Sequence, residues 1–344
     1  VKANKTHKPE PPPRPTLNGF GHVWVVQCKN LGSDKKLAVM IVYQYSSRLK
    51  ELAILKEFTE LDEAKNNLVK CGDHFVMKRD FCLVFELLDK SLCDFMKKRC
   101  YLSLRVAEIR VVTQQMLVTL NALKHIGVIH CDIKPDNITL VNHTALSFKI
   151  QLSDFGLAQK VSKIIQGTKV QALGYRAPEL FLGFPYNEAI DMWFLGCVMA
   201  YLYTGKHLYQ TGSEYESIRL MVTLFGNPDV NLDFTTPGMF WKLKTQSGHS
   251  SFTARIHKSA ETFTRPEDLD THCKQEKSKA ETEDVQAFIG LLKSSLQLNP
   301  VGRIKPADAL GHDFITLKHF PDGKFTDYVK SSTSIIQNCR LEKP

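Results

Sequence analysis

Residues 130–137 read H-C-D-I-K-P-D-N, and this string is followed by D-F-G at 154–156 and A-P-E at 177–179. A lone Asp is usually a solvated or capping residue and a lone D-F-G is usually a turn, but the three motifs in this order are a specific signal. The first follows a long helical pattern that stops near Gly127, and the second follows the alternating strand F-K-I-Q-L-S. The pattern predicts that two loops bring Asp132 and Asp154 to one site.

The residue types at these positions are those that phosphoryl transfer uses. Asp132 would accept or orient the proton of a substrate hydroxyl, and Lys134 would neutralise charge on the transferred phosphoryl group. Asn137 and Asp154 carry the oxygen ligands that Mg²⁺ prefers. We therefore predict Asp132 and Lys134 as catalytic residues and Asn137 and Asp154 as metal ligands.

The composition is that of a soluble globular protein. The 344 residues are 43% hydrophobic and 24% charged, which is enough for one large domain with a sizeable core. The longest apolar stretch, residues 192–203, is shorter than the roughly 20 residues that span a bilayer, so we expect a buried helix and no membrane association. The net charge of +9 comes from no single long basic run, so we expect no direct nucleic-acid binding.

The nine cysteines are scattered along the chain without a C-x-x-C pair. An odd total without paired spacing favours free thiols in a reducing compartment over a disulfide framework or a zinc site. No charged-then-apolar segment opens the chain, so we also expect no secretion signal.

Hydrophobic periodicity predicts a small, strand-rich lobe at residues 20–88. Four apolar residues from Leu49 to Phe58 recur at three-residue steps, which predicts one amphipathic helix at 46–58. The strands of this lobe are predicted at 23–26, 37–42, 75–77 and 82–87.

Beyond residue 88 the period changes to that of helices, which predicts a larger and mainly helical second lobe. Helices are predicted from residue 106 to near Gly127 and at 189–203, 214–225, 284–296 and 306–312. The predicted division of the chain is a disordered Pro/Lys-rich tail at 1–19, a domain at 20–318 (lobes at 20–88 and 89–318, with a polar insertion at 226–282) and a C-terminal tail at 319–344.

The motifs together resemble the eukaryotic protein kinases over about residues 20–318. The residues that carry the resemblance are C-L-V-F-E-L-L (82–88), the three motifs above, A-I-D-M-W-F-L-G-C-V-M-A (189–200) and N-P-x-x-R-I (299–304). The stretch F-P-Y-N-E before residue 189, the segment S-E-Y-E-S-I-R and the long insertion look most like the homeodomain-interacting protein kinases.

The resemblance implies a bilobal α+β kinase fold and transfer of phosphate from ATP, with Mg²⁺, to Ser or Thr of protein substrates. It implies nuclear or cytoplasmic location, transcriptional regulators as substrates or partners, and a monomer. The Lys134-Pro135 pair is typical of Ser/Thr specificity. Glu179 is expected to pair with Arg303, and Asp191 to brace the catalytic loop from a buried helix.

The resemblance also assigns a nucleotide pocket. Phe85 falls at its rear, Glu86 to Leu88 form the hinge that binds adenine, and Thr139 lies on its floor, where an apolar residue is common. The remaining positions carried over are Gly19, Gly21 and Val23 of the glycine-rich loop, Ala38 and Met40 of the following strand, and Glu51 of the helix.

Several of these positions depart from the kinase pattern. Residues 37–40 read L-A-V-M where a kinase carries V-A-I-K, so Met40 replaces the lysine that contacts the phosphates and pairs with Glu51. Glu51 is expected to lack its partner. The glycine-rich loop is reduced to T-L-N-G-F-G-H-V, and Lys169 and Leu173 replace the activation-loop Tyr and Arg of this family.

These departures leave two functions open: a weakened Ser/Thr kinase, or a pseudokinase that acts as a binding scaffold or competitor of active relatives. A lysine of a neighbouring strand could substitute for the missing one, and an engineered Lys→Met change is a further alternative. A small-molecule phosphotransferase is less favoured, because such enzymes lack the A-P-E segment. The candidates for the substituting lysine are Lys29, Lys35 and Lys36.

Overall fold

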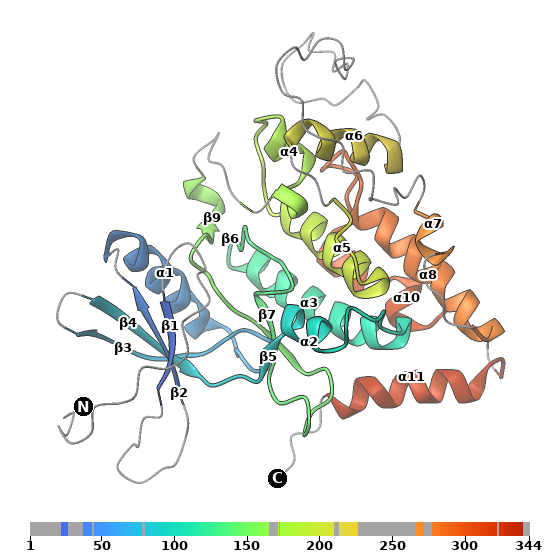
Figure 1. Cartoon of the computed structure of the whole chain (residues 1–344), viewed down its shortest axis with the longest axis horizontal. Coiled ribbons are helices and arrows are strands. Elements are labelled where there is room, and N and C mark those ends of the chain that lie inside the picture. The colour runs from blue at the N-terminus through green and yellow to red at the C-terminus, as the bar shows by residue number, and fades with distance from the viewer. Residues whose placement is uncertain are drawn as a thin grey trace.

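The computed structural model describes residues 22–26, 37–42, 45–77, 80–164, 171, 173–209, 213–225, 266–271, 277–321 and 323–339. The predicted tail at 1–19 and most of the predicted insertion lie outside these residues. The chain forms a small lobe with a sheet and one main helix, joined to a larger helical lobe (Figure 1). This is the predicted bilobal α+β architecture.

The small lobe is built on a four-stranded antiparallel sheet in the order β1-β2-β4-β3. Alternate residues of β2 face opposite sides: Val39 packs in a small outer cluster, whereas Ala38 and Met40 pack against the main core. The elements are β1 (His22–Val26), β2 (Leu37–Val42), α1 (Tyr45–Glu57), the 3₁₀ turn η1 (Phe58–Glu60), β3 (Cys71–Met77) and β4 (Asp80–Glu86).

The helix and the strand at 37–42 are where the sequence predicted them. β3 begins at Cys71, earlier than the predicted residue 75, and nearly all of its side chains are exposed. It lies at the edge of the sheet, and with both faces exposed it lacks the alternation of buried and exposed residues that reveals a half-buried strand.

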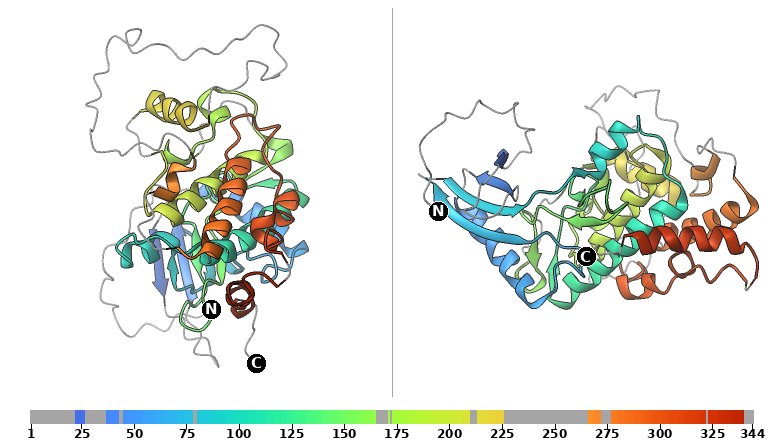
Figure 2. Two further views of the ribbon diagram at one scale, coloured as in Figure 1. Left: turned by 90° about the vertical axis from the view of Figure 1, so that its right-hand side faces the viewer. Right: turned by 90° about the horizontal axis from the view of Figure 1, so that it is seen from below.

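The large lobe is organised around two long helices, α3 and α5 (Figures 1 and 2). Its helices are α2 (Leu92–Lys98), α3 (Val106–His125), α4 (Pro178–Phe181), α5 (Ala189–Thr204), α6 (Glu214–Phe225), α7 (Asp268–Thr271), α8 (Lys279–Ser295), α9 (Pro306–Leu310), α10 (Asp313–Thr316) and α11 (Thr326–Asn338). Its strands are β5 (Lys90–Ser91), β6 (Val128–Ile129), β7 (Ile138–Leu140), β8 (Ile150–Leu152) and β9 (Gln159–Lys160), and its 3₁₀ turns are η2 (Val161–Lys163) and η3 (Leu173–Tyr175).

The central helix α5 is buried from Ile190 to Tyr203, as the apolar stretch predicted. It ends at Gly205, which has a left-handed φ of 72° and lies so close to Tyr101 that a Cβ would sit 2.0 Å from the Tyr101 carbonyl oxygen. Only glycine satisfies both conditions. No helix in the described part of the chain is long and apolar enough to cross a membrane.

Two helices differ from the sequence-based expectation. α8 begins at Lys279, inside the predicted insertion, because the Ser278 hydroxyl caps it by accepting the Glu281 backbone N–H. The predicted C-terminal tail contains α11, which packs against α3 (Figure 2). Its Ser- and Thr-rich sequence has weak intrinsic helix propensity, so tertiary packing supplies most of its stability.

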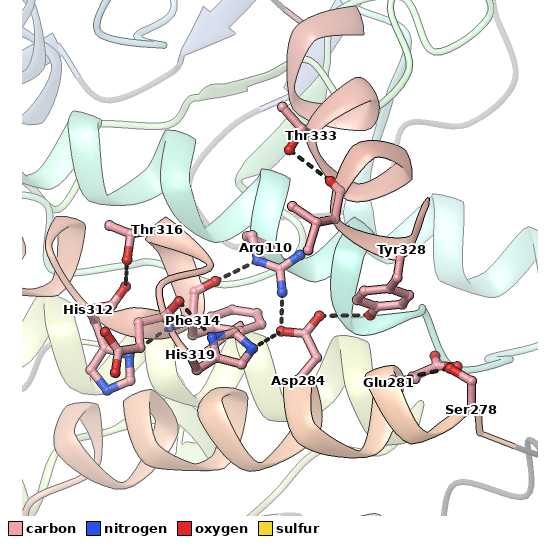
Figure 3. Close-up of polar contacts among 12 residues, drawn as sticks. Arg110, Ser278, Glu281, Asp284, His312, Phe314, Thr316, His319, Tyr328 and Thr333 are labelled. Atoms are coloured by element: carbon pink, nitrogen blue, oxygen red, sulfur yellow. Dashed lines mark hydrogen bonds and ion pairs between the residues drawn. The ribbon is translucent and has the colours of Figure 1, made fainter. Parts of the chain in front are cut away.

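A buried polar cluster fixes α11 to the large lobe (Figure 3). Arg110 of α3, which is fully buried, pairs with Asp284 of α8 and donates to the Phe314 carbonyl oxygen. The Tyr328 hydroxyl of α11 donates to Asp284 Oδ2 at 2.7 Å, and His319 Nε2 lies 3.2 Å from Asp284 Oδ1. Asp284 therefore joins three helices and the segment before α11.

A second contact, between Tyr175 and His207, holds the segment that precedes A-P-E. The Tyr175 hydroxyl lies 2.8 Å from His207 Nδ1, and the His207 ring stacks on Tyr201 of α5 with ring centroids 4.7 Å apart. Burial lowers the pKa of His207, and the charge of Asp136 acts weakly in the opposite direction. The His207 ring therefore connects the segment before A-P-E, through Tyr175, to Tyr201 of the central helix α5.

We expect Tyr328→Phe to lower the free energy of unfolding by about 1.5–3 kcal/mol, because it removes a hydrogen bond to a buried carboxylate. Urea denaturation monitored by circular dichroism measures this change. Lys330→Ala, at an exposed position of the same helix, is the control and should change stability little. Equal effects of the two substitutions would show that Asp284 does not need the Tyr328 hydroxyl.

We expect stability to fall as the pH drops below 6.5, partly through His207. The unfolded histidine binds a proton near its ordinary pKa of 6.5, whereas the folded one does so only at lower pH, so stability is lost between the two values. His207→Gln should flatten the loss of melting temperature between about pH 7 and pH 5, relative to the unchanged protein. His125→Gln, at an exposed position, should keep the original profile; the same flattening in both variants would contradict this assignment.

Candidate active site

Asp191 of α5 bonds to the backbone of the catalytic loop, which lies between β6 and β7. Its carboxylate accepts the backbone N–H groups of His130 at 2.8 Å and Cys131 at 3.0 Å. Burial raises the pKa of Asp191 to about 7, and the two N–H donors oppose that rise. Cys131 has a φ of 64°, a left-handed conformation that the two hydrogen bonds help to maintain. The predicted bracing role of Asp191 is confirmed.

Asp132, Lys134 and Asn137 come together at the end of this loop. Lys134 Nζ donates to Asp132 Oδ2 at 2.7 Å, and Asn137 Nδ2 donates to the Asp132 carbonyl oxygen at 2.8 Å and to its Oδ2 at 3.0 Å. The Asp132 carboxylate is thus fixed in orientation beside an ammonium group. A hydroxyl bound there would have a carboxylate to accept or orient its proton and a cation to offset developing negative charge.

The D-F-G loop is tied to the same residues through β7 and β8. The Ser153 N–H and hydroxyl both donate to the Asn137 carbonyl oxygen, at 2.9 and 3.1 Å. Asp154 follows with a φ of 60° and accepts the Gly156 N–H at Oδ1. The structure therefore places Asn137 and Asp154 at the adjoining ends of two paired strands. Sequence analysis had missed Ser153, although its place directly before D-F-G is a usable signal.

Phe155 connects the D-F-G loop to both the catalytic loop and the small lobe. Its ring makes edge contacts with His130 and with Phe58 of η1, each with ring centroids 4.7 Å apart. Burial lowers the pKa of His130, and the neutral ring accepts the Asp132 N–H at Nδ1 and bonds the Ser153 carbonyl oxygen at Nε2. Asp154 stays partly exposed while Phe155 is buried. These packing partners were also missed, because apolar contacts across lobes leave no local pattern.

The donor set fits Mg²⁺ that binds together with phosphate groups. The Asn137 amide nitrogen is used toward Asp132, which leaves its oxygen as the atom able to bind a cation, and Asp154 adds a carboxylate. Mg²⁺ commonly binds through one or two such groups and completes its shell with water and substrate phosphates. Within the described residues, no group of three or more His, Cys, Asp or Glu side chains forms a dedicated metal cage.

Met40 lies on the face of β2 that packs against the main core, opposite Leu83 of β4. Glu51 is on α1 and is only 2% exposed. Met40 cannot donate a hydrogen bond to Glu51, but Glu51 takes part in other interactions. One of its effects is on Cys71: burial raises the pKa of that thiol, and the negative charge of Glu51 adds to the rise.

The residues assigned to the nucleotide pocket lie on neighbouring strands. Phe85 is buried on β4 opposite Ala38, Glu86 is exposed at the end of β4, and Leu88 packs partly against the core. Thr139 of β7 is half-buried, with its hydroxyl 3.5 Å from that of Ser153. Val23 pairs with Met40 through the backbone. The predictions for Gly19, Gly21, Lys29, Lys35, Lys36 and Lys169 lie outside the described residues.

The predicted support of the A-P-E motif is present. Arg303 forms a two-point ion pair with Glu179, with Nη1 to Oε1 at 2.7 Å and Nη2 to Oε2 at 3.0 Å, and both side chains are buried. The seven cysteines that the structure describes are free, and Cys28 and Cys273 lie outside the described residues.

Comparison with known proteins agrees with this geometry. The protein kinase domain family model matches residues 19–315. A solved kinase domain superposes with a TM-score of 0.68 at 26% identity, covering 87% of this chain and 93% of that chain. Homeodomain-interacting protein kinase 2 of Mesocricetus auratus is 34% identical over 93% of this chain.

Other relatives are also named as protein kinases. Homeodomain-interacting protein kinase 1 of Caenorhabditis elegans is 33% identical over 94% of this chain, and dual specificity protein kinase YAK1 of Saccharomyces cerevisiae is 30% identical over 88% of it. The chain spans 29% of the length of the Mesocricetus relative, 42% of the Caenorhabditis one and 41% of the yeast one. With a family match over most of its length and the catalytic loop and D-F-G geometry described above, the chain belongs to the protein kinase family.

Proposed function

We propose that this chain phosphorylates Ser and Thr hydroxyls of proteins, using ATP and Mg²⁺, at a rate that Met40 reduces. The observation that carries the proposal is the assembled catalytic loop, in which Lys134 and Asn137 both bond to Asp132. A site kept only for binding has no evident physical need for a carboxylate, a cation and two metal ligands in this arrangement.

The residues of this chain have distinct roles in the proposed reaction. Asp132 orients the substrate hydroxyl and accepts its proton, and Lys134 offsets the charge that develops on the transferred group. Asn137 and Asp154 would hold Mg²⁺, which when bound neutralises charge on the phosphate oxygens of ATP. Phe85, the hinge at Glu86 to Leu88 and Thr139 would enclose the adenine ring.

Met40 favours the second candidate, a pseudokinase scaffold that competes with active relatives. Loss of one preorganised donor typically lowers turnover by about 10²–10³, which is severe but leaves the other groups in place. The names of the relatives, homeodomain-interacting protein kinases, support transcriptional regulators as substrates or partners, whereas a nuclear or cytoplasmic location rests on the sequence resemblance alone. The substrates or partners, the location and a monomeric state all remain proposals for this chain.

Nucleotide binding should be weak and should depend on Mg²⁺, because the two metal ligands are present whereas Met40 cannot contact phosphate. In a thermal-shift titration, ATP with Mg²⁺ should raise the melting temperature, and ATP with EDTA should not. Asp154→Asn should remove most of the Mg²⁺-dependent shift. Equal stabilisation by ATP with and without the metal would count against these ligands.

Met40→Lys should raise phosphoryl transfer to a Ser/Thr peptide or a generic basic protein by about 10- to 1000-fold, the inverse of losing a preorganised donor. Stability should change little, since the lysine stem resembles the methionine side chain in length and apolarity. Radiolabelled phosphate incorporation measures the change. Adding Asp132→Asn to Met40→Lys should abolish the gain, because the group that orients the hydroxyl is removed.

Ile41→Lys is the matched control for this experiment. Ile41 neighbours Met40 on β2 but packs with the outer cluster, so a lysine there should give no gain. If the Met40→Lys protein folds and binds ATP yet transfers no phosphate, the scaffold function becomes the better explanation.

A further inference from the structure

The end of α2 and the loop that leads to α3 combine positive charge with two exposed apolar side chains. Residues 97–105 read K-K-R-C-Y-L-S-L-R, with four cations and no acid. Tyr101 is 48% exposed and Leu102 is 64% exposed, and the side chains of Lys97, Lys98 and Arg99 are exposed as well. We call these five residues the α2–α3 loop surface.

The three consecutive cations of this surface make no ion pair with any described residue. The acids nearest to them in the sequence are engaged elsewhere: Asp94 accepts the Ser91 hydroxyl at 3.0 Å, and Glu108 pairs with Arg105 at 3.4 Å. Cations in the last turn of a helix also offset its dipole, which accounts for the two lysines but not for the exposed apolar pair beyond them. The surface therefore presents uncompensated positive charge beside apolar area.

Backbone hydrogen bonds hold the loop in a fixed conformation. The Tyr101 N–H donates to the Met96 carbonyl oxygen at 2.8 Å, and the Leu102 N–H donates to the Arg99 carbonyl oxygen at 3.1 Å. The Tyr101 backbone also lies against Gly205 at the end of α5. A surface that is fixed in this way loses little conformational entropy when a partner binds.

Charge complementarity identifies the occupant as an acidic segment of another protein. Several Glu or Asp side chains would offset the three cations, and an apolar side chain between them would cover Leu102 and the exposed part of Tyr101. An apolar centre surrounded by charged groups is the usual anatomy of a protein interface, and Tyr and Arg are enriched among the residues that contribute most to binding.

The surface is less suited to a lipid bilayer or to a nucleic acid. The apolar side of α2 is buried at Leu92, Phe95 and Met96, so only the two loop residues could enter a bilayer, whereas a stable attachment takes a larger apolar face or a second anchor. Single-stranded nucleic acids stack successive bases on several aromatic side chains, and residues 97–105 supply one aromatic ring.

We propose that the α2–α3 loop surface docks an acidic segment of a partner protein that contains a large apolar residue. Lys97, Lys98 and Arg99 bind the carboxylates, and Tyr101 and Leu102 contact the apolar side chain. The surface shares no residue with the candidate active site, so docking requires neither nucleotide nor phosphoryl transfer and does not depend on the proposed function.

A labelled Glu-rich peptide with a central Leu-Leu pair is the probe, and fluorescence anisotropy with the full chain measures its binding. Replacing every Glu of the peptide with Gln should weaken binding about 3- to 100-fold, the range expected for three exposed ion pairs. Replacing both Leu with Ser should weaken it about 3- to 30-fold, because the apolar contact is lost. Equal affinities of the three peptides, or no saturable binding of the first, would overturn the proposal.

A charge-reversal variant tests the location. Lys97→Glu combined with Lys98→Glu should weaken binding of the Glu-rich peptide about 10- to 100-fold. Lys318→Glu combined with Lys330→Glu is the matched control, because it changes the net charge equally at exposed positions of the same lobe, and it should keep the original affinity. Equal losses in the two variants would show that the peptide responds to the overall charge of the protein, which would contradict the proposal.

Leu102→Ser tests the apolar contact and serves also if the charge-reversal variant fails to fold. It should weaken binding about 3- to 10-fold, whereas Val301→Ser, at another exposed apolar position, should not. An unchanged affinity of the folded Leu102→Ser protein would count against the proposal.

Two competitors test the other classes of partner: vesicles that contain phosphatidylserine, and a thymidine oligonucleotide. Neither should displace the Glu-rich peptide when it is added at an equal concentration of negative charge. If either one does, the surface belongs to that class of partner and the proposal is overturned.

Discussion

The hydrogen bonds from the catalytic-loop backbone to Asp191 are the constraint on which the candidate active site depends. The carboxylate accepts the N–H groups of His130 and Cys131, and α5, which carries it, is buried along almost its whole length. The loop conformation is therefore set by the best-packed element of the large lobe. Asp132 and Asn137 are fixed in position as well, because they follow within the same loop and bond to each other.

The small lobe is joined to this centre through aromatic packing. Phe155 touches His130 on one side and Phe58 on the other, so the D-F-G loop, the catalytic loop and the end of α1 form one continuous contact. The two lobes therefore share a core instead of meeting across a polar boundary.

The sequence predicted those features that have local periodicity or a dense motif. α3 and α6 were found because their apolar residues recur at the helical period, and α5 because its apolar stretch is long. Asp132, Asn137 and Asp154 were found because their motifs are specific. α11 was missed because its Ser and Thr residues favour other conformations in isolation. The contacts of Phe155 with His130 and Phe58 could not be foreseen, since they join segments that are distant in the sequence.

The position of Asp284 bears on where this domain ends. The kinase family model stops at residue 315, and the sequence alone suggested an end at 318, yet the Tyr328 hydroxyl bonds to Asp284 and His319 Nε2 lies 3.2 Å from it. A protein cut at either point would leave a buried carboxylate with Arg110 as its remaining side-chain partner among the described residues, and would uncover the surface of α3 that α11 protects. The folding unit therefore extends through Cys339, and its C-terminal helix is as much a part of the catalytic lobe as the helices that the motifs identify.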